Sequence, residues 1–215
     1  QLMTVLITGA SRGIGRALCD HYRAAGKTVI ATARHPDADQ VGLDVTDPAN
    51  VAALGRLVPG PLDLLICNAG VLLDRGQTLD GGYAPDLWAQ SFATNVTGVF
   101  LCVQALVTQL RAARGKIAII SSQMGSDARA PGGNYIYRAS KAAALNLGRN
   151  LAVDLRACGI AVGIYHPGWV QTDMGGSEAE ITVAQSASGL AARFDHLSIA
   201  STGCFETWDA RALPF

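Results

Sequence analysis

Residues 2–15 read LMTVLITGASRGIG, and this stretch decides the fold class. The apolar run over residues 2–8 predicts a buried strand that leads directly into a glycine turn. Apolar periodicity then predicts a helix over residues 13–25, which Gly26 ends. Glycines in such a turn let the backbone approach a pyrophosphate, and the free N–H groups of the helix attract it. A bare tight turn is the alternative, but the position between strand and helix favours a dinucleotide site.

The rest of the chain alternates short apolar runs with helical patterns. Further strands are predicted at residues 28–33, 41–43, 62–67, 116–121, 160–165 and 203–207. Helices are predicted at residues 48–57, with Asp47 as N-cap, and at 86–110, 135–158 and 183–191. Strands separated by helices need right-handed crossovers, and their apolar composition fits burial on both faces. We therefore expect an α/β protein with a doubly wound parallel sheet, a Rossmann fold, as a single domain over residues 1–215.

Composition excludes several classes of protein. Hydrophobic residues make up 49% of the 215 residues, which argues against disorder, and the formal net charge of zero argues against nucleic acid as a partner. The five cysteines form no CxxC pair, so we expect free thiols in a reducing compartment. We find no apolar window of about 18 residues, as a membrane span requires, and no histidine cluster that would bind a metal. A soluble, cytoplasmic protein without a metal site is expected.

The second predicted strand ends at Arg34 without the carboxylate that would bind the adenosine ribose of NAD. Arg34 and Arg12, which lies inside the glycine turn, are placed to bracket a 2′-phosphate by charge-assisted hydrogen bonds. Solvated surface charges are the alternative for each arginine. The pair favours NADP(H) over NAD(H). Only nine residues separate Arg34 from Asp44, so no full helix fits there and the adenine end is expected to be exposed.

Tyr137 and Lys141 stand at positions i and i+4 of a predicted helix, and therefore on one face. A phenol has a pKa near 10, and a neighbouring ammonium group moves it toward neutral pH. The preceding strand ends at Ser121 and Ser122, which places a hydroxyl at the carboxyl end of a parallel strand, where ligands bind. Asn95 lies inside a predicted helix, an unfavourable site unless its amide has a role. These side chains are the candidate catalytic group.

Five motifs, in this order, resemble the short-chain dehydrogenase/reductase family over residues 2–207. They are the TGxxxGIG turn at 8–15, Cys67-Asn68-Ala69-Gly70, Asn95, the Ser122/Tyr137/Lys141 set, and Pro167-Gly168-Trp169-Val170-Gln171-Thr172. The runs 137–146, 166–176 and 204–209 resemble a branch of that family that contains C-factor-like proteins and small carbonyl reductases.

The resemblance implies a role for each matching residue. Tyr137 would be the general acid in reduction and the general base in oxidation. Lys141 would lower the pKa of Tyr137 and bind the nicotinamide ribose, Ser122 would hold the substrate oxygen, and Asn95 would support a water. The cofactor would be held by Gly9, Ser11, Arg12, Gly13, Ile14, Gly15, Arg34, Asp44, Val45, Asn68, Ala69, Gly70, Tyr137, Lys141, Pro167, Gly168, Val170 and Thr172.

Function is predicted as hydride transfer between NADP(H) and a small carbonyl or secondary alcohol. The alternatives are an NAD-preferring alcohol dehydrogenase, a dehydratase or epimerase on the same fold, and a cofactor-binding regulatory or signalling protein. Ser121 competes with Ser122, and Tyr135 is excluded because Ala139, not lysine, follows four positions later. The small residues after Thr172 suggest a mobile, partly open lid, with Trp169 and Met174 lining the pocket. The helices at 86–110 and 135–158 are rich in Ala and Leu, and because such helices often form a dimer interface in the family that the chain resembles, a homodimer or homotetramer is implied.

Overall fold

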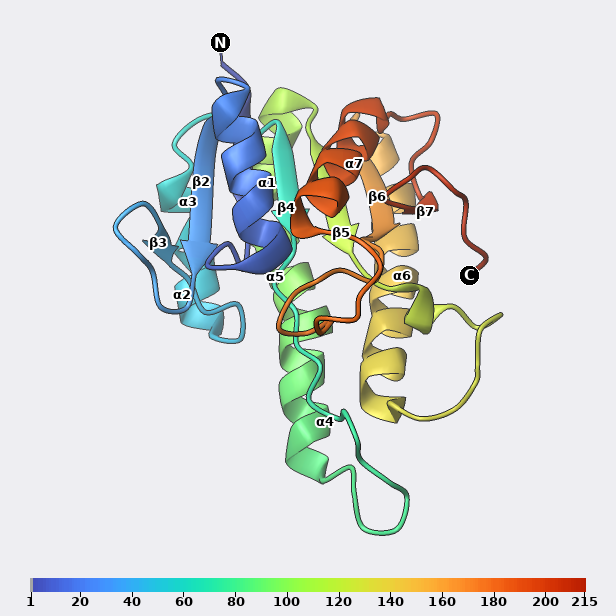
Figure 1. Cartoon of the computed structure of the whole chain (residues 1–215). Coiled ribbons are helices and arrows are strands. Elements are labelled where there is room, and N and C mark those ends of the chain that lie inside the picture. The colour runs from blue at the N-terminus through green and yellow to red at the C-terminus, as the bar shows by residue number, and fades with distance from the viewer. Residues whose placement is uncertain (1) are drawn as a thin grey trace.

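The computed structural model describes residues 2–215, and over these residues it forms one seven-stranded parallel sheet (Figure 1). The strand order is β3-β2-β1-β4-β5-β6-β7, and each neighbouring pair is parallel. The chain reverses its winding direction between β1 and β4, where dinucleotides bind in such sheets. The predicted doubly wound sheet is confirmed. The strands are β1 (Thr4–Ile7), β2 (Thr28–Ala33), β3 (Val41–Gly42), β4 (Leu64–Cys67), β5 (Lys116–Ile120), β6 (Ala161–His166) and β7 (Phe205–Thr207).

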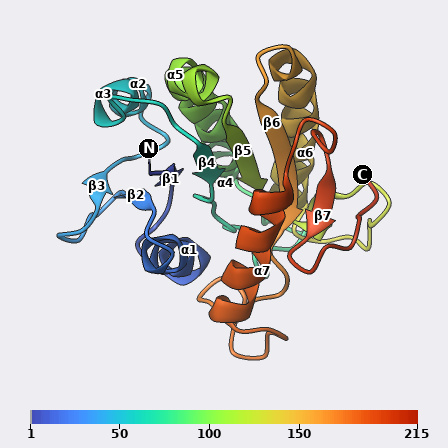
Figure 2. The ribbon, with the colours of Figure 1, turned by 90° about the horizontal axis from the view of Figure 1, so that it is seen from above.

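Helices cover both faces of the sheet. Viewed from above in Figure 2, α1 (Gly13–Ala24) and α7 (Val183–His196) lie on one face, and α2 (Pro48–Ala52), α3 (Leu54–Leu57), α5 (Gly98–Ala113) and α6 (Tyr135–Arg156) lie on the other. Alternate residues of β1 explain this arrangement: Val5 and Ile7 pack toward α1 and α7, whereas Leu6 packs toward α5. Each face therefore has its own hydrophobic core.

Three predicted helices differ from the observed ones. The predicted helix at 48–57 is broken at Ala53 into α2 and α3, although Asp47 caps it as expected by accepting from the N–H groups of Ala49 and Asn50. The predicted helix at 86–110 consists of α4 (Pro85–Phe92), a π-helical turn η1 (Ala93–Thr97) and α5. The last helix, α7, continues to His196 because Phe194 still packs into the core.

The run Pro85–Ala113 is long and apolar enough to cross a membrane by length and composition alone, which corrects the expectation that no segment reaches this limit. In the structure its α5 part packs on the sheet through Val99, Cys102, Leu106 and Leu110. Its apolar character is accounted for by this core position. The five cysteines carry no disulfide, and burial raises the pKa of the Cys67 and Cys102 thiols.

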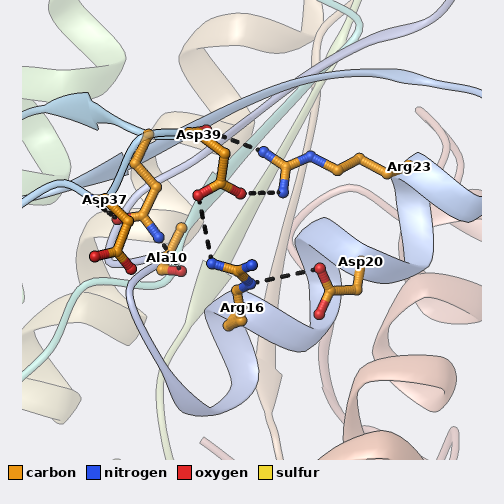
Figure 3. Close-up of polar contacts among 7 residues, drawn as sticks. Ala10, Arg16, Asp20, Arg23, Asp37 and Asp39 are labelled. Carbon is orange, nitrogen blue, oxygen red and sulfur yellow. Dashed lines mark hydrogen bonds and ion pairs between the residues drawn. The ribbon is translucent and has the colours of Figure 1, made fainter.

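Residues 34–40 form the short connection between β2 and β3, and no helix forms there, as the spacing predicts. Figure 3 shows how the connection is held: Asp39 pairs with Arg23 at 2.7 Å and with Arg16 at 3.5 Å, both from α1. Gln40 also donates to the carbonyl of Ala10 in the glycine turn. These bonds place the end of β2 beside the turn.

Candidate active site

The glycine turn between β1 and α1 is bound closely to the end of β4. Asn68 donates from its amide to the carbonyls of Thr8 and Gly9, and the Thr8 hydroxyl accepts from the N–H groups of Asn68 and Ala69. A Cβ atom on Gly9 would lie 2.8 Å from the Cα of Ala69, and the φ of Gly9 is +68°. Only glycine fits this approach, which brings residues 8–15 and 68–70 together as predicted.

The amino terminus of α1 is open for an anion. No side chain among residues 2–215 caps it, and its first turn contains no acidic residue. Its N–H groups and helix dipole are therefore free to bind a phosphate. Thr172 lies over the same turn, since its Cγ2 would be 3.4 Å from a Cβ on Gly13. The residues present fit a dinucleotide whose pyrophosphate rests on the turn.

Replacing Gly15 by alanine is expected to disrupt this turn. The added Cβ would lie 2.3 Å from the Gly9 carbonyl oxygen and 2.5 Å from the Asn68 amide nitrogen, so backbone must shift. We expect a loss of about 1–3 kcal/mol in the free energy of unfolding, measured by urea denaturation, and weaker dinucleotide binding. Gly55→Ala is the matched control, because its nearest contact would be an ordinary 3.5 Å. Equal stability of the two variants would contradict this account of the turn.

The two arginines predicted at the adenine end lie in different surroundings. Arg34 is exposed at the end of β2, close enough to Asp44 for its charge to contribute to the lowered pKa of that carboxyl group. The main cause of that lowering is the hydrogen bond from the Thr46 hydroxyl. Arg12 forms an exposed ion pair at 2.6 Å with Asp173 of the segment after β6. Arg34 therefore remains available for a ligand phosphate, whereas Arg12 is shared with Asp173.

The carboxyl end of β5 carries the reactive hydroxyl groups. The Ser122 hydroxyl accepts from the Met124 N–H at 3.1 Å and lies close enough to the Tyr137 phenol to oppose the rise of its pKa. Ser121 instead donates to the main-chain carbonyl of Lys141 at 3.0 Å, which removes it as a competitor for that position. The loop after β5 reaches α6 because residue 125 is glycine: a Cβ there would lie 2.6 Å from the Lys141 carbonyl carbon. Tyr135 is 40% exposed and packs on Tyr83.

Lys141 and Tyr137 are both buried, and burial decides the pKa of each. Burial raises the pKa of Tyr137 to about 12, against the opposing effect of the Ser122 hydroxyl, and burial lowers the pKa of Lys141 to about 8. Lys141 Nζ donates to the Ile120 carbonyl and lies 5.6 Å from the centre of the Tyr137 ring. The expected lowering of the tyrosine pKa by lysine is therefore not found in the protein chain itself. A protonated phenol at neutral pH is the form that a general acid requires.

Asn95 lies in the π-helical turn, which explains its unfavourable place within a helical run. Its Oδ1 accepts from the Val71 N–H at 2.8 Å, and its Nδ2 donates to the Val71 carbonyl and to the Ser140 hydroxyl. Ser140 in turn donates to the Tyr137 carbonyl. Gly70 lies beside both Lys141 and Asn95. A Cβ atom on Gly70 would be 3.3 Å from Lys141 Nζ and 3.4 Å from Asn95 Oδ1. Ser140 was not predicted from the sequence.

Asp74 was also not predicted from the sequence. It is fully buried beside the start of α6. Its Oδ2 accepts from the main-chain N–H groups of Ile136 at 2.8 Å and Tyr137 at 3.3 Å. Its Oδ1 has no hydrogen-bond partner among residues 2–215. The carboxylate also contributes to the raised pKa of Tyr137, after burial. A signal was present in the sequence, since Asp74 directly follows the apolar run Val71-Leu72-Leu73 after the Asn68-Ala69-Gly70 turn.

The segment after β6 folds over the site with its own hydrogen bonds. Val170 pairs with Ile181, Trp169 donates from its indole to the Gly175 carbonyl, and Pro167 accepts from Ser186. Arg75 donates to the Met174 carbonyl, and this contact joins the segment to the loop after β4. The mobility predicted for this lid stays a prediction. Trp169 lines a cavity of about 440 Å³, whereas Met174 does not.

All residues predicted at the site lie along the carboxyl edge of the sheet or on the segments that follow it. Ser122, Tyr137, Lys141 and Asn95 lie on the side of β1 that carries β5 and α6, while Arg34, Asp44 and Val45 lie on the other side, after β2 and β3. Val45 is buried against α5, where a Cβ on Gly98 would lie 2.9 Å from its carbonyl oxygen. Among residues 2–215 no group of acidic, cysteine and histidine side chains could hold a metal ion.

A family model described as short chain dehydrogenase matches residues 3–181. The chain belongs to the short-chain dehydrogenase/reductase family. It is 33% identical to 1-hydroxy-2-glutathionyl-2-methyl-3-butene dehydrogenase of Rhodococcus sp. (strain AD45), over 99% of both chains. It is also 37% identical to C-signal of Myxococcus xanthus, over 73% of this chain and 94% of that one.

Solved structures of this family superimpose over the whole chain. An NADPH-bound carbonyl reductase from chicken fatty liver is 31% identical with a TM-score of 0.90, and both chains are fully covered. A carbonyl reductase from Pseudomonas aeruginosa PAO1 is 30% identical with a TM-score of 0.89, also with full coverage. The protein is thus an NAD(P)-dependent oxidoreductase that acts on CH–OH or C=O groups.

Proposed function

We propose that this protein reduces a small carbonyl compound to a secondary alcohol with NADPH, and that Tyr137 donates the proton. The observation that carries the proposal is the buried Tyr137, whose pKa burial raises to about 12, beside Ser122 at the carboxyl end of β5. Among similar proteins, the chicken carbonyl reductase is one that binds NADPH. Stopped-flow or steady-state assays of NADPH oxidation with a panel of aldehydes and ketones test this proposal directly.

Each side chain has a distinct task in this proposal. NADPH, when bound on the glycine turn, supplies the hydride. Ser122 donates a hydrogen bond to the carbonyl oxygen, and Tyr137 gives that oxygen its proton as negative charge develops there. Lys141, with a pKa of about 8, exchanges protons readily near neutral pH and would replace the proton that Tyr137 loses. Asn95 and Ser140 hold the start of α6 and η1 in register, so that these groups stay aligned.

The same residues work in the opposite order during oxidation. Tyr137 then accepts the hydroxyl proton of the alcohol, which requires its phenolate form. Because burial raises the pKa of Tyr137, the protein chain by itself favours the protonated form and therefore reduction. We infer that reduction is the favoured direction at neutral pH, and that oxidation gains rate as the pH rises.

Arg34 is proposed to select NADPH over NADH. It is exposed, and no acidic side chain among residues 2–215 pairs with it, since Asp39 is held by Arg16 and Arg23. Arg34→Ala is expected to weaken NADPH binding about tenfold or more and to leave NADH binding unchanged. Fluorescence titration of both cofactors measures this, with Arg56→Ala, an exposed arginine of α3, as the control. Equal affinity of the wild type for NADPH and NADH would refute the selection.

A homodimer or homotetramer is proposed from the exposed apolar residues of α5 and α6, two helices on the same face of the sheet. Phe100 is 41% exposed and Val153 is 73% exposed. Apolar side chains on neighbouring helices are typical of an interface between copies. Phe100→Asp combined with Val153→Asp is expected to produce a monomer, as measured by light scattering during size-exclusion chromatography. A wild type that is already monomeric would contradict this proposal.

A regulatory or signalling role is the second candidate function, and the similarity to C-signal is the observation that favours it. A protein that only binds the cofactor has no need for the arrangement of Ser122, Tyr137 and Lys141. Binding of NADPH without turnover of any carbonyl in the panel would favour this regulatory function over the reductase function.

A further inference from the structure

A cavity of about 440 Å³ lies at the carboxyl ends of β6 and β7. Gln123, which directly follows Ser122, forms one side of it. The segment after β6 contributes Trp169 and Glu180, and the segment after β7 contributes Trp208 and Arg211. The tail after β7 lies along the loop after β5, since Ser126 donates to the Pro214 carbonyl. The volume is within the range of about 300–1,000 Å³ that small-molecule sites have.

His166, the last residue of β6, lines this cavity and is only 8% exposed. Its Nδ1 has no hydrogen-bond partner among the described residues 2–215. Burial lowers the pKa of His166 to about 4, and the positive charges of Arg129 and Arg211 add to this effect. The imidazole is therefore uncharged at neutral pH, and the two guanidinium groups carry the positive charge of the cavity.

Both guanidinium groups keep donors for a ligand. Arg129 uses one nitrogen on the Gln123 side chain at 2.8 Å, and Arg211 uses Nε on Asp209 at 3.0 Å. Each guanidinium has five N–H donors, so most remain free. Glu180 and Asp209 formally balance these two positive charges, so the cavity offers guanidinium donors to a singly charged ligand but lacks the excess positive charge that a doubly charged phosphate would need.

The walls of the cavity also carry flat apolar surface. Trp169 is held by the hydrogen bond of its indole to Gly175, and Trp208 lies opposite the segment after β6 at Gly168. Gly168 has a φ of +91°, and a Cβ there would lie 2.9 Å from the Trp208 ring. Glycine at this position thus permits the indole to approach the lid. Two indole rings beside two guanidinium groups match an aromatic or otherwise apolar acid.

We propose that this cavity binds the carboxylate end of an organic carbonyl substrate, with Arg129 and Arg211 as its recognition groups. The ligand would pass Gln123 to present its carbonyl group to Ser122 and Tyr137. The identification of the ligand as substrate rests on the proposed reductase function, whereas carboxylate binding by the cavity does not.

Binding is tested with 4-carboxybenzaldehyde and its methyl ester, by quenching of tryptophan fluorescence in the full chain. A Trp88→Phe background leaves Trp169 and Trp208, the two tryptophans that line the cavity, as fluorescence reporters. We expect the acid to bind about tenfold more tightly than the ester, and Arg129→Gln with Arg211→Gln to remove that preference. Arg156→Gln, at the exposed end of α6, is the control that keeps it. Arg211→Gln alone, an exposed position, serves if the double variant does not fold.

Equal affinity of the wild type for acid and ester, or an undiminished preference in the arginine variants, would overturn the proposal. Turnover of unsubstituted benzaldehyde with NADPH separates this result from the proposed function. If benzaldehyde is reduced but the acid is not preferred, the cavity proposal alone fails. If the acid is preferred in binding but no aldehyde is reduced, the reductase function alone fails.

Discussion

Tyr137→Phe is expected to lower kcat for carbonyl reduction by about 10²–10⁴-fold, the usual contribution of a general acid. The variant removes only the phenolic oxygen, which lies beside Ser122, and keeps the buried ring at the start of α6. In this variant the carbonyl oxygen of the substrate has no phenol at position 137 to give it a proton when the hydride is transferred. The measurement is the rate of NADPH oxidation at saturating carbonyl substrate.

Two controls separate a lost proton donor from a damaged site. Tyr135→Phe changes an exposed tyrosine two residues away on the same helix and is expected to keep full activity. NADPH binding to the Tyr137→Phe variant is expected to stay within about fivefold of the wild type, because one neutral hydrogen bond contributes about 1 kcal/mol. A variant that retains a rate near that of the wild type would show that another group supplies the proton.

Asp74→Ala is expected to lower the free energy of unfolding by about 2–4 kcal/mol, through the loss of a helix cap and of two buried hydrogen bonds. The Asp74 carboxylate accepts from the N–H groups of Ile136 and Tyr137, and the N-cap residue Asn134 makes no side-chain hydrogen bond to α6. Without Asp74 both N–H groups are left buried without an acceptor. The negative charge is also favoured by the positive end of the α6 dipole.

Urea denaturation at one fixed protein concentration measures this effect, and Asp127→Ala, at an exposed loop position, is the control. Asp74→Asn keeps an acceptor oxygen and removes the charge, so it is expected to lose less stability than Asp74→Ala. Since the carboxylate contributes to the raised pKa of Tyr137, the asparagine variant should also shift the pH dependence of activity toward lower pH. An Asp74→Ala protein as stable as the wild type would contradict the capping role.

The helix that carries Tyr137 illustrates what local patterns reveal. Residues four apart lie on one face of any α-helix, so the pairing of Tyr137 with Lys141 follows from spacing alone. The same holds for the turn at 8–15, because a strand, three glycines and a helix leave few conformations open to the backbone. The position of Ser122 at a strand end also followed, since apolar runs mark strands that are buried on both faces.

The competition between Ser121 and Ser122 shows where local patterns stop. Neighbouring residues of an extended chain point to opposite sides, and motif spacing favoured Ser122 without showing its partner. In the structure Ser121 bonds to the backbone of α6, which leaves Ser122 for Tyr137. The expected influence of Lys141 on the pKa of Tyr137 is not found, and burial, which depends on everything packed around both side chains, decides both pKa values.

Local rules acting within a few residues were sufficient for the sheet, the glycine turn, the α6 motif and the choice of family. The capping of α6 by Asp74, the π-helical turn at Asn95, the bond from Arg75 to the lid and the cavity beside His166 required the tertiary structure. Each of these joins groups far apart in the chain, such as Asp74 and Ile136, which are 62 residues apart. Hydrogen-bond geometry and desolvation depend on distances that only folding creates, and for this reason no periodicity in the sequence contains them.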